Sequence, residues 1–310
     1  MTKSNTKIKV IGVGGSGSNA VSRMAKCKIK GIELIAVNTD AQDLVKAKAD
    51  LKLRIGKKTT KGLGTGMNPE IGRRSALENR GEFSEIFKDS DVIFITCGLG
   101  GGTGSGAAPV IAEIAKESGA LTLAVVTRPF SFEGQVRERI AENGIKRLKE
   151  RVDTLISISN NKLLSTLDLN IPLVNAFWIC DDILRQAVQG ISDLISLPGI
   201  INVDFADVKA IMKNAGSALF GVGKAQGEGR AEKAALAAIN SPLLDVSLRG
   251  AKGALFNVSG GKDISLSEID QVAKVITQEI NSEAKIIFGA VQDEKLKKGE
   301  IKVTVIATGF

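Results

Sequence analysis

The sequence predicts an α/β protein in which a parallel-sheet domain is joined by a long helix to a smaller α+β domain. Its first half alternates short apolar runs with amphipathic helical patterns, which is typical of a parallel sheet covered on both faces. A long helical pattern follows, and after it several strands surround one helix. We therefore expect domains over 1–172 and 200–310, joined by a central helix over 173–199.

The elements of the first domain follow in chain order. The predicted strands are KIKVIGV (7–13), IELIAVN (32–38), LKLRI (51–55), DVIFIT (91–96), LTLAVVT (121–127) and DTLISIS (153–159). The predicted helices cover about 18–26, 68–87, 105–119 and 135–151. The second of these helices opens on Asn-Pro, a helix-start signal. In such sheets ligands bind at the carboxyl ends of the strands.

The second domain has a different pattern. The long helix runs over about 173–197 and is closed by Pro198-Gly199. A later helix begins at Ser265, where SLSE resembles a capping box. The strands predicted around it are GALFNVSG (253–260), KIIFGAV (285–291) and EIKVTVIAT (300–308).

Composition excludes several classes of function. The 310 residues contain no histidine, which removes Ser-His-Asp and Cys-His catalysis and histidine metal sites. Three scattered cysteines show no metal-ligand spacing, so we expect no protein-built metal site and a reducing, cytoplasmic setting. No apolar run approaches the roughly 20 residues of a membrane helix. The start leaves no room for a signal peptide, so neither export nor membrane insertion is expected.

The net charge of +8 raises the question of nucleic acid. Basic residues are interleaved with acids, as in RERIAENGIKRLKER (137–151), which is typical of a solvated helix face. Aromatic residues are only 4% of the chain, so platforms for base stacking are scarce. We expect no nucleic-acid partner.

Glycine-rich segments precede three predicted helices and carry the main functional signal. Two of them follow strands of one sheet, so they would lie on the same edge. Backbone N–H groups at a helix N-terminus, without side chains in the way, bind phosphate. The segments are GVGGSGSN (12–19), GLGTGMNPE (62–70) and GLGGGTGSG (98–106), and together they predict a polyphosphate ligand. The spacing Gly12-x-Gly14-x-x-Gly17, with Asp40 after the second strand, leaves a dinucleotide-binding Rossmann oxidoreductase as an alternative.

GLGGGTGSG is not followed by Gly-Lys-Ser/Thr, so it is not a Walker motif. It resembles the tubulin signature, and in detail that of the FtsZ family, the bacterial tubulin-like cell-division GTPases. This resemblance implies a Rossmann-like parallel-sheet GTPase domain, a central helix and a smaller α+β C-terminal domain. It extends through VNTDAQDL (37–44), GLGTGMNPEIGR (62–73), VVTRPFSFEG (125–134), NVDFADV (202–208) and RAEKAALAAINSPLLD (230–245).

The resemblance implies a GTP/GDP site, with Mg²⁺ carried in with the nucleotide. Phe177 would stack on guanine and Asp181 would accept hydrogen bonds from its N1–H and exocyclic amine, while Glu133 and Arg137 would contact ribose and phosphate. The remaining contacts would come from Gly15, Ser16, Gly17, Ser18 and Asn19, from Gly102, Thr103 and Gly104 around the β- and γ-phosphates, and from Asn38 and Asn68 in further loops. Alternatively, Phe177 is a core residue, and Glu133 and Arg137 are an exposed pair.

Hydrolysis would need carboxylates, because the chain has no histidine. Asn202, Asp204 and Asp207 follow the long helix, so we expect them at the opposite end of the sheet from the glycine segments. The resemblance implies that they act on the neighbouring subunit's nucleotide, so that head-to-tail polymerisation completes the site. Asp204 could also cap the helix that starts near Phe205.

Some positions depart from the family pattern. Ser16 stands where many members have glycine, and a positive φ there would strain it. Thr65 and Met67 replace smaller residues, and Trp178 is expected to pack within the protein. A GTP-binding filament protein with negligible turnover is therefore a second candidate.

The chain ends at IATGF directly after its last predicted strand. Family members usually continue with a linker and a short peptide that binds membrane tethers. We therefore expect membrane-tethering division proteins as partners only if such a tail exists, and a midcell division ring as the location.

Overall fold

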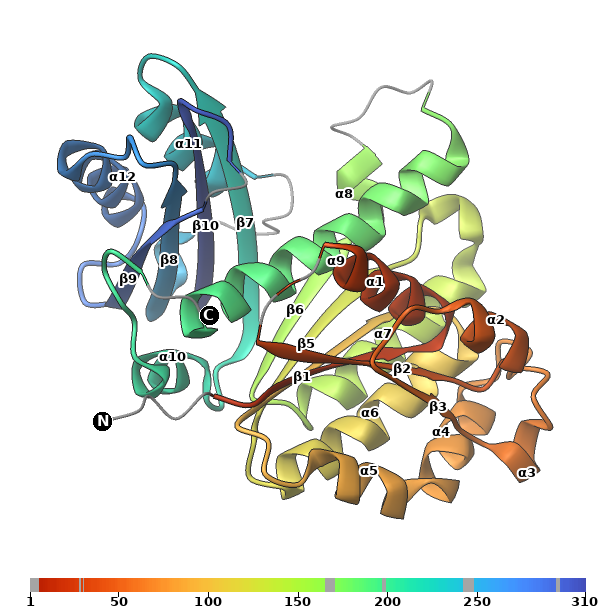
Figure 1. The fold of residues 1–310 in the computed structure, drawn as a ribbon. Coiled ribbons are helices and arrows are strands. Elements are labelled where there is room, and N and C mark those ends of the chain that lie inside the picture. Colours follow the sequence, from red (N-terminus) through yellow and green to blue (C-terminus); the bar gives the residue numbers. More distant parts are fainter. Residues whose placement is uncertain are drawn as a thin grey trace. The chain divides into compact units, whose positions relative to one another are not determined.

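The computed structural model describes residues 6–27, 29, 31–164, 171–196, 199–241, 248–293 and 296–310. The chain divides into two compact units, residues 1–189 and 190–310 (Figure 1). The predicted fold class is confirmed: a mostly parallel sheet with flanking helices, a long helix, and a second α+β unit.

The first unit contains a parallel sheet. Its strands lie in the order β3-β2-β1-β4-β5-β6, and each neighbouring pair is parallel. All six predicted strands are present, within two residues of the expected ends. Their bounds are β1 (Ile8–Val13), β2 (Ile32–Asn38), β3 (Leu51–Arg54), β4 (Val92–Gly98), β5 (Leu121–Arg128) and β6 (Thr154–Ser159).

Helices cover both faces of this sheet. On one face lie α1 (Gly14–Lys26) and α2 (Ala41–Lys46); on the other lie α4 (Pro69–Glu78), α5 (Arg80–Phe87), α6 (Gly102–Glu117) and α7 (Gln135–Lys149) (Figure 1). Apolar side chains of β1 and β4 pack with α5 and α6 in a buried core that includes Ile11, Ile95, Phe83 and Ile111. Three short helices complete the unit: α3 (Lys57–Thr60), η1 (Ser131–Glu133) and α8 (Asn160–Leu164).

Three predicted helix boundaries were wrong. Helix α1 starts at Gly14 instead of residue 18, and α6 starts at Gly102 instead of residue 105, because glycines that read as loop form the first helical turns. The predicted helix over 68–87 is two helices that meet at Asn79. The Asn79 side chain accepts from the Gly56 N–H at 3.0 Å and donates to Glu82 at 2.7 Å.

The long helix α9 (Leu173–Ser196) is present as predicted, although Pro198, its expected stop, lies outside the described residues. None of the helices in the described part of the chain combines the length and apolar character that crossing a membrane requires.

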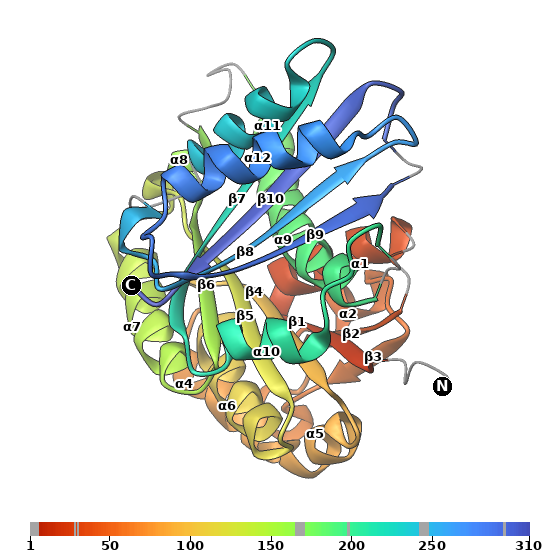
Figure 2. The same cartoon turned by 90° about the vertical axis from the view of Figure 1, so that its left-hand side faces the viewer.

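The second unit has a mixed sheet in the order β7-β10-β8-β9, with only the last pair parallel. Helices α11 (Arg230–Ile239) and α12 (Leu266–Gln278) lie across one face (Figure 2). Ser265 forms the predicted capping box with Glu268. The remaining elements are α10 (Phe205–Met212), η2 (Leu248–Gly250), β8 (Gly253–Gly260), β9 (Lys285–Gln292) and β10 (Glu300–Thr308).

Strand β7 (Gly216–Gln226), which contains three glycines, was not among the predicted strands. A Cβ at Gly221 or Gly223 would collide with backbone carbonyls of α11, so these glycines allow the helix to pack closely on the strand.

Candidate functional site

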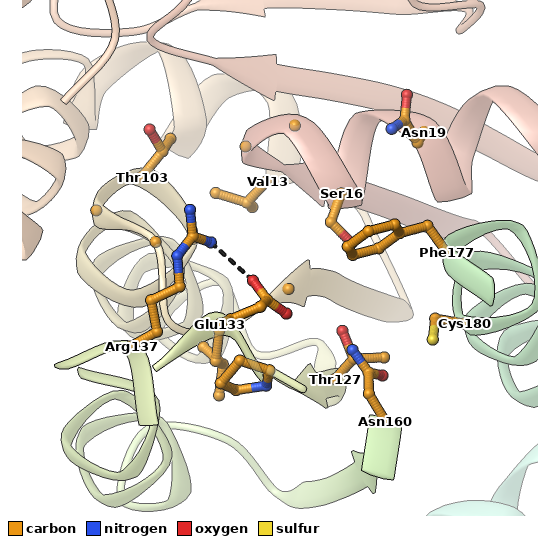
Figure 3. Close-up of a pocket in the computed structure, with 18 of the residues that line it drawn as sticks. Val13, Ser16, Asn19, Thr103, Thr127, Glu133, Arg137, Asn160, Phe177 and Cys180 are labelled. Atoms are coloured by element: carbon orange, nitrogen blue, oxygen red, sulfur yellow. Dashed lines mark hydrogen bonds and ion pairs between the residues drawn. The ribbon is translucent and has the colours of Figure 1, made fainter. Parts of the chain in front are cut away.

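A pocket of about 470 Å³ opens in the first unit at the carboxyl ends of β1, β4, β5 and β6 (Figure 3). Thr103 and Arg137 lie at one end, and Phe177, Cys180 and Asn160 lie at the other (Figure 3). Ten of the predicted nucleotide residues line it: Gly15, Ser16, Asn19, Gly102, Thr103, Gly104, Glu133, Arg137, Phe177 and Asp181.

Two helix N-termini reach this pocket. Val13 and Gly101, the N-cap residues of α1 and α6, line it, and neither supplies a side-chain cap. Nearby helices differ, because Asp40 caps α2 and Asn68 caps α4. The first-turn N–H groups of α1 and α6 have no intrahelical partner, so this end of the pocket attracts anions.

Three threonine hydroxyls meet at the same end. The Thr103 hydroxyl lies 2.8 Å from that of Thr39 and 3.4 Å from that of Thr65. Thr39 is fully buried, whereas Thr65 and Thr103 line the pocket. The cluster therefore presents hydroxyl oxygens and protons beside the N-terminus of α6.

An ion pair lies along one wall. Arg137 donates to Glu133 at 3.0 Å (Figure 3), and the second Glu133 oxygen accepts from the Phe130 N–H at 2.9 Å. Glu133 is therefore fixed by its own short helix, while Arg137 has further N–H donors for a ligand.

The other end combines a ring with a buried acid. Phe177 is 41% exposed and packs edge-on against Phe130, with centroids 5.3 Å apart, so it is not the core residue of the alternative interpretation. Asp181, one helical turn later, is 6% exposed. It accepts from Arg23 at 3.1 Å and from Ser16 at 3.4 Å. Burial raises the pKa of Asp181 to about 6, although Arg23 opposes the increase.

Cys180 adjoins Asp181 in the pocket wall. Burial raises the pKa of the Cys180 thiol to about 12, so it stays protonated and unreactive at neutral pH.

Asn160 was missed from the sequence. It is 5% exposed, lines the pocket, and its Oδ1 has no hydrogen-bond partner in the described structure. The signal was available, since Asn160 directly follows a predicted strand and so falls at the ligand-binding edge of the sheet. Among the other lining residues, Val13, Gly14, Thr65 and Met67 lie in the predicted phosphate-binding segments, whereas Thr127 and Cys180 were not predicted as site residues.

Four predicted nucleotide residues lie outside the pocket lining. A Cβ at Gly17 would lie 2.5 Å from the Thr96 carbonyl, so this glycine lets α1 pack against β4. Ser18 is buried. The side chains of Asn38 and Asn68 accept backbone N–H groups, from Asp40 at 3.2 Å and from Glu70 at 2.9 Å.

The three predicted hydrolytic residues belong to the second unit, whereas every residue lining the pocket belongs to the first. Asn202, Asp204 and Asp207 are exposed. Asn202 accepts from the Gly199 N–H at 2.9 Å. Asp204 is the N-cap residue of α10, but its side chain makes no capping hydrogen bond, so the capping alternative is wrong.

The structure shows the backbone or surroundings of residues that depart from the family pattern. Ser16 is not among the residues with positive φ, so the strain considered for it is absent. Met67 does adopt a left-handed backbone, with φ of 62°. Trp178 is half exposed instead of packed within the protein, and the Arg23 guanidinium lies 5.3 Å from its ring centroid.

Two family models match the chain. Residues 7–168 match the model described as the Tubulin/FtsZ family, GTPase domain. Residues 216–310 match the FtsZ family, C-terminal domain.

Solved structures agree with these matches. An empty FtsZ dimer from M. jannaschii is 48% identical, with a TM-score of 0.96 over 99% of this chain and 89% of that one. The W319Y mutant of FtsZ from M. jannaschii is 49% identical, with a TM-score of 0.94 over 98% and 91% of the two chains. GDP-bound CetZ1 from Haloferax volcanii, at 22% identity and a TM-score of 0.82 over 98% and 94%, shares the fold.

Proposed function

Because the chain belongs to the tubulin/FtsZ family, a family of GTPases, we propose that it binds GTP and GDP, polymerises head-to-tail with itself and hydrolyses GTP between subunits. The family assignment removes the support for the oxidoreductase alternative. In cells this activity would serve division, as a cytoplasmic filament at the midcell ring. Membrane-tethering proteins would be partners only through a C-terminal tail.

One observation supports the nucleotide assignment most directly. A single pocket joins two helix N-termini without side-chain caps to a buried carboxyl beside a partly exposed ring. The first end suits phosphates and the second suits a base with N–H donors. Its volume of about 470 Å³ falls within the usual range of small-molecule sites, about 300–1,000 Å³.

Base recognition would use hydrogen-bond acceptors in the pocket, to which adenine has no N1–H to donate. Guanine presents N1–H and an exocyclic amine on one edge, whereas adenine presents an unprotonated N1 there. The ionised Asp181 and the unpartnered Oδ1 of Asn160 are both acceptors in the pocket. Phe177 would stack on the base, and its contact with Phe130 would hold the ring in place.

Hydrolysis would use Asn202, Asp204 and Asp207 of the neighbouring subunit. Their exposure leaves them available to a partner, and carboxylates orient an attacking water and accept its proton. The relative solved as an FtsZ dimer supports self-association of this chain. Mg²⁺ would be held mainly by the phosphates, with hydroxyl oxygens such as that of Thr103 nearby, and would neutralise phosphate charge.

The second candidate, negligible turnover, rests on Ser16 and on the changes at Thr65 and Met67; the strain considered at Ser16 is absent, whereas Met67 has a positive φ of 62°. Sedimentation with GTP, GDP and a slowly hydrolysed analogue, with phosphate release measured over a range of protein concentrations, tests the proposal. We expect assembly with GTP and a steep rise of specific activity above a threshold concentration. Constant activity per molecule under conditions where only monomer sediments would refute hydrolysis between subunits.

GTP affinity is expected to fall as the pH is lowered from 7.5 to 5. The pKa of Asp181 is about 6 in the empty protein, and its protonated form loses acceptor capacity for guanine. Below pH 6 the loss approaches about tenfold per pH unit. Equilibrium binding without Mg²⁺ measures it, and Asp181→Asn should have a flatter pH profile. The same profile in both proteins would contradict the assignment.

The raised pKa of Asp181 has the opposite effect on folding. Its contribution to the free energy of unfolding is fully present below pH 3.8, the ordinary value, and is lost as the pH rises through about 6. Comparing urea unfolding of the parent and Asp181→Asn over this window isolates the contribution.

Gly101→Val is expected to abolish detectable nucleotide binding while the fold survives. Gly101 lines the pocket, its φ of −96° suits any residue, and a Cβ there would meet nothing within 4 Å. The added side chain therefore fits the empty protein but crowds the phosphate end. Gly104→Val is a poorer test, because its Cβ would lie 2.5 Å from the Gly98 carbonyl. Normal GTP affinity with unchanged circular dichroism would exclude this loop from the site.

A further inference from the structure

Arg23 links the pocket-lining residue Asp181 to Trp178, in an arrangement that the proposed function does not use. Arg23 comes from α1, while Trp178 and Asp181 lie three positions apart on α9. The Arg23 guanidinium contacts the Asp181 carboxylate and also lies over the Trp178 ring. Trp178 is the only tryptophan in the chain, and the chain has no tyrosine.

The geometry of the ion pair is asymmetric. Arg23 directs both Nε and Nη2 to one oxygen, Asp181 Oδ2, at 3.3 and 3.1 Å. The other oxygen, Oδ1, receives only the Ser16 hydroxyl at the long distance of 3.4 Å. An arginine that held the carboxylate in the usual fork would occupy both oxygens. Here one oxygen is saturated, and the other keeps capacity to accept from a ligand.

Trp178 supports the guanidinium from another direction. The distance of 5.3 Å from Arg23 Cζ to the ring centroid is within the range of cation–π attraction. Because Trp178 is half exposed, the ring contributes little to the core. Its contact with Arg23 limits the positions that this long side chain can take.

We propose that Arg23 and Trp178 form a clamp that orients Asp181 and keeps it ionised, with Oδ1 presented to the N–H edge of a guanine base. Arg23 and Trp178 are thus positioning residues for base specificity. The inference rests on the proposed function, in which Asp181 is the guanine acceptor.

Among the groups around Asp181, Arg23 is the one that most favours the ionised form of its carboxyl. Burial raises the pKa of Asp181, and the neighbouring charge of Asp182 raises it further. Arg23 and the Ser16 hydroxyl act in the opposite direction. Asp182 itself is paired with Arg185 at 2.6 Å on the same helix. Glu133, across the pocket, is a further negative charge that acts on the adjoining Cys180. Arg23 is the one cation among the described residues that bonds to Asp181.

The test compares variants that remove one property each. Arg23→Gln removes the charge, Arg23→Lys keeps the charge without the planar fork, and Trp178→Phe keeps a ring that Trp178→Ala removes. Arg249→Gln is the matched control, because Arg249 is a 76% exposed arginine paired with Glu279 in the second unit. Affinities for GTP, ITP and ATP are measured by equilibrium binding between pH 5 and 8.5, without Mg²⁺ and below the assembly threshold. ITP lacks the exocyclic amine, so it separates the two guanine N–H contacts.

For Arg23→Gln we expect the midpoint of the GTP affinity profile to rise by about one pH unit, so that the loss of affinity approaches about tenfold below the original midpoint. ATP affinity should stay unchanged, so the GTP preference shrinks. Arg23→Lys and Trp178→Ala should move the midpoint less, and Trp178→Phe and Arg249→Gln should leave it in place. Trp178 fluorescence of the empty protein provides a second readout: its pH titration should follow Asp181 and disappear in Asp181→Asn.

Different results would contradict the base site at Asp181 and the clamp formed by Arg23 and Trp178. If Asp181→Asn leaves the GTP preference intact, the assignment of the base site is wrong. If Asp181→Asn weakens GTP binding, but Arg23→Gln lowers only the melting temperature and leaves the midpoint and the ITP-to-GTP ratio unchanged, the clamp is wrong and Arg23 is structural.

Discussion

Asp207→Ala is expected to bind GTP almost normally and to hydrolyse it at least about 100-fold more slowly than the parent, the scale of a lost general acid–base group. The pocket proposed to bind the nucleotide lies wholly in the first unit, whereas Asp207 is an exposed residue of the second. Removing the carboxylate therefore leaves the binding residues untouched. Equilibrium binding and phosphate release, measured on assembled protein, separate the two effects.

A mixing experiment tests whether the acids act in trans. Asp207→Ala keeps a loaded pocket without the acid, and Gly101→Val keeps the acid without a loaded pocket. Combined, they should recover part of the parent activity wherever an intact acid meets bound GTP. Asp207→Asn, which preserves side-chain volume, serves as the control for local distortion. Full activity in Asp207→Ala alone, or no recovery in mixtures that co-sediment, would contradict the shared site.

Asp181→Ala is expected to reduce the preference for GTP over ATP by about 100-fold or more, because sites built around hydrogen bonds discriminate strongly. The variant also leaves the Arg23 guanidinium without its carboxylate partner, which destabilises the empty protein. Asp181→Asn keeps one acceptor and should show a smaller loss of preference. Competition of GTP and ATP for the same site measures both.

The control for this prediction is Asp182→Ala. Asp182 adjoins Asp181 on α9 but bonds to Arg185 and Gln186 of its own helix, and it does not line the pocket. It should keep the GTP preference. An equal loss in both variants would indicate damage to α9, and an intact preference in Asp181→Ala would remove Asp181 from base recognition.

The sheet of the first unit could be predicted well because its strands are continuous apolar runs between helical patterns. Several of the misses involved glycine. Glycine has weak local preference, so the sequence suggested loops at 14–17 and 102–104, where packing on the sheet produces helical turns. Strand β7 was not predicted, and the need for glycine at 221 and 223 becomes visible only from the close packing of α11.

The candidate site could be predicted where its residues belong to a sequence motif, and less well where tertiary packing determines which residues line the pocket. Cys180 has no local signature, and the only sequence signal for Asn160 is its place directly after a predicted strand; they line the pocket because β6 ends there and α9 passes beside it. Gly17 lies in a predicted phosphate-binding segment. Its role is instead to let α1 pack closely on β4, where the Thr96 carbonyl leaves no room for a Cβ. The partners of Asp181 come from α1, more than 150 residues earlier in the chain, so spacing along the sequence gave no indication of Arg23.

The uncapped starts of α1 and α6 have a consequence for the energetics of the empty protein. Neither N-cap residue supplies a side-chain partner to the first-turn amides, so these turns lack a contact that usually stabilises the start of a helix. A bound phosphate would supply the missing partners to both turns at once. Occupancy would thus join the first turns of α1 and α6 through one ligand, with the nucleotide acting as part of the fold. The protein's resistance to proteolysis and heat would then rise and fall with the cellular concentration of its nucleotide.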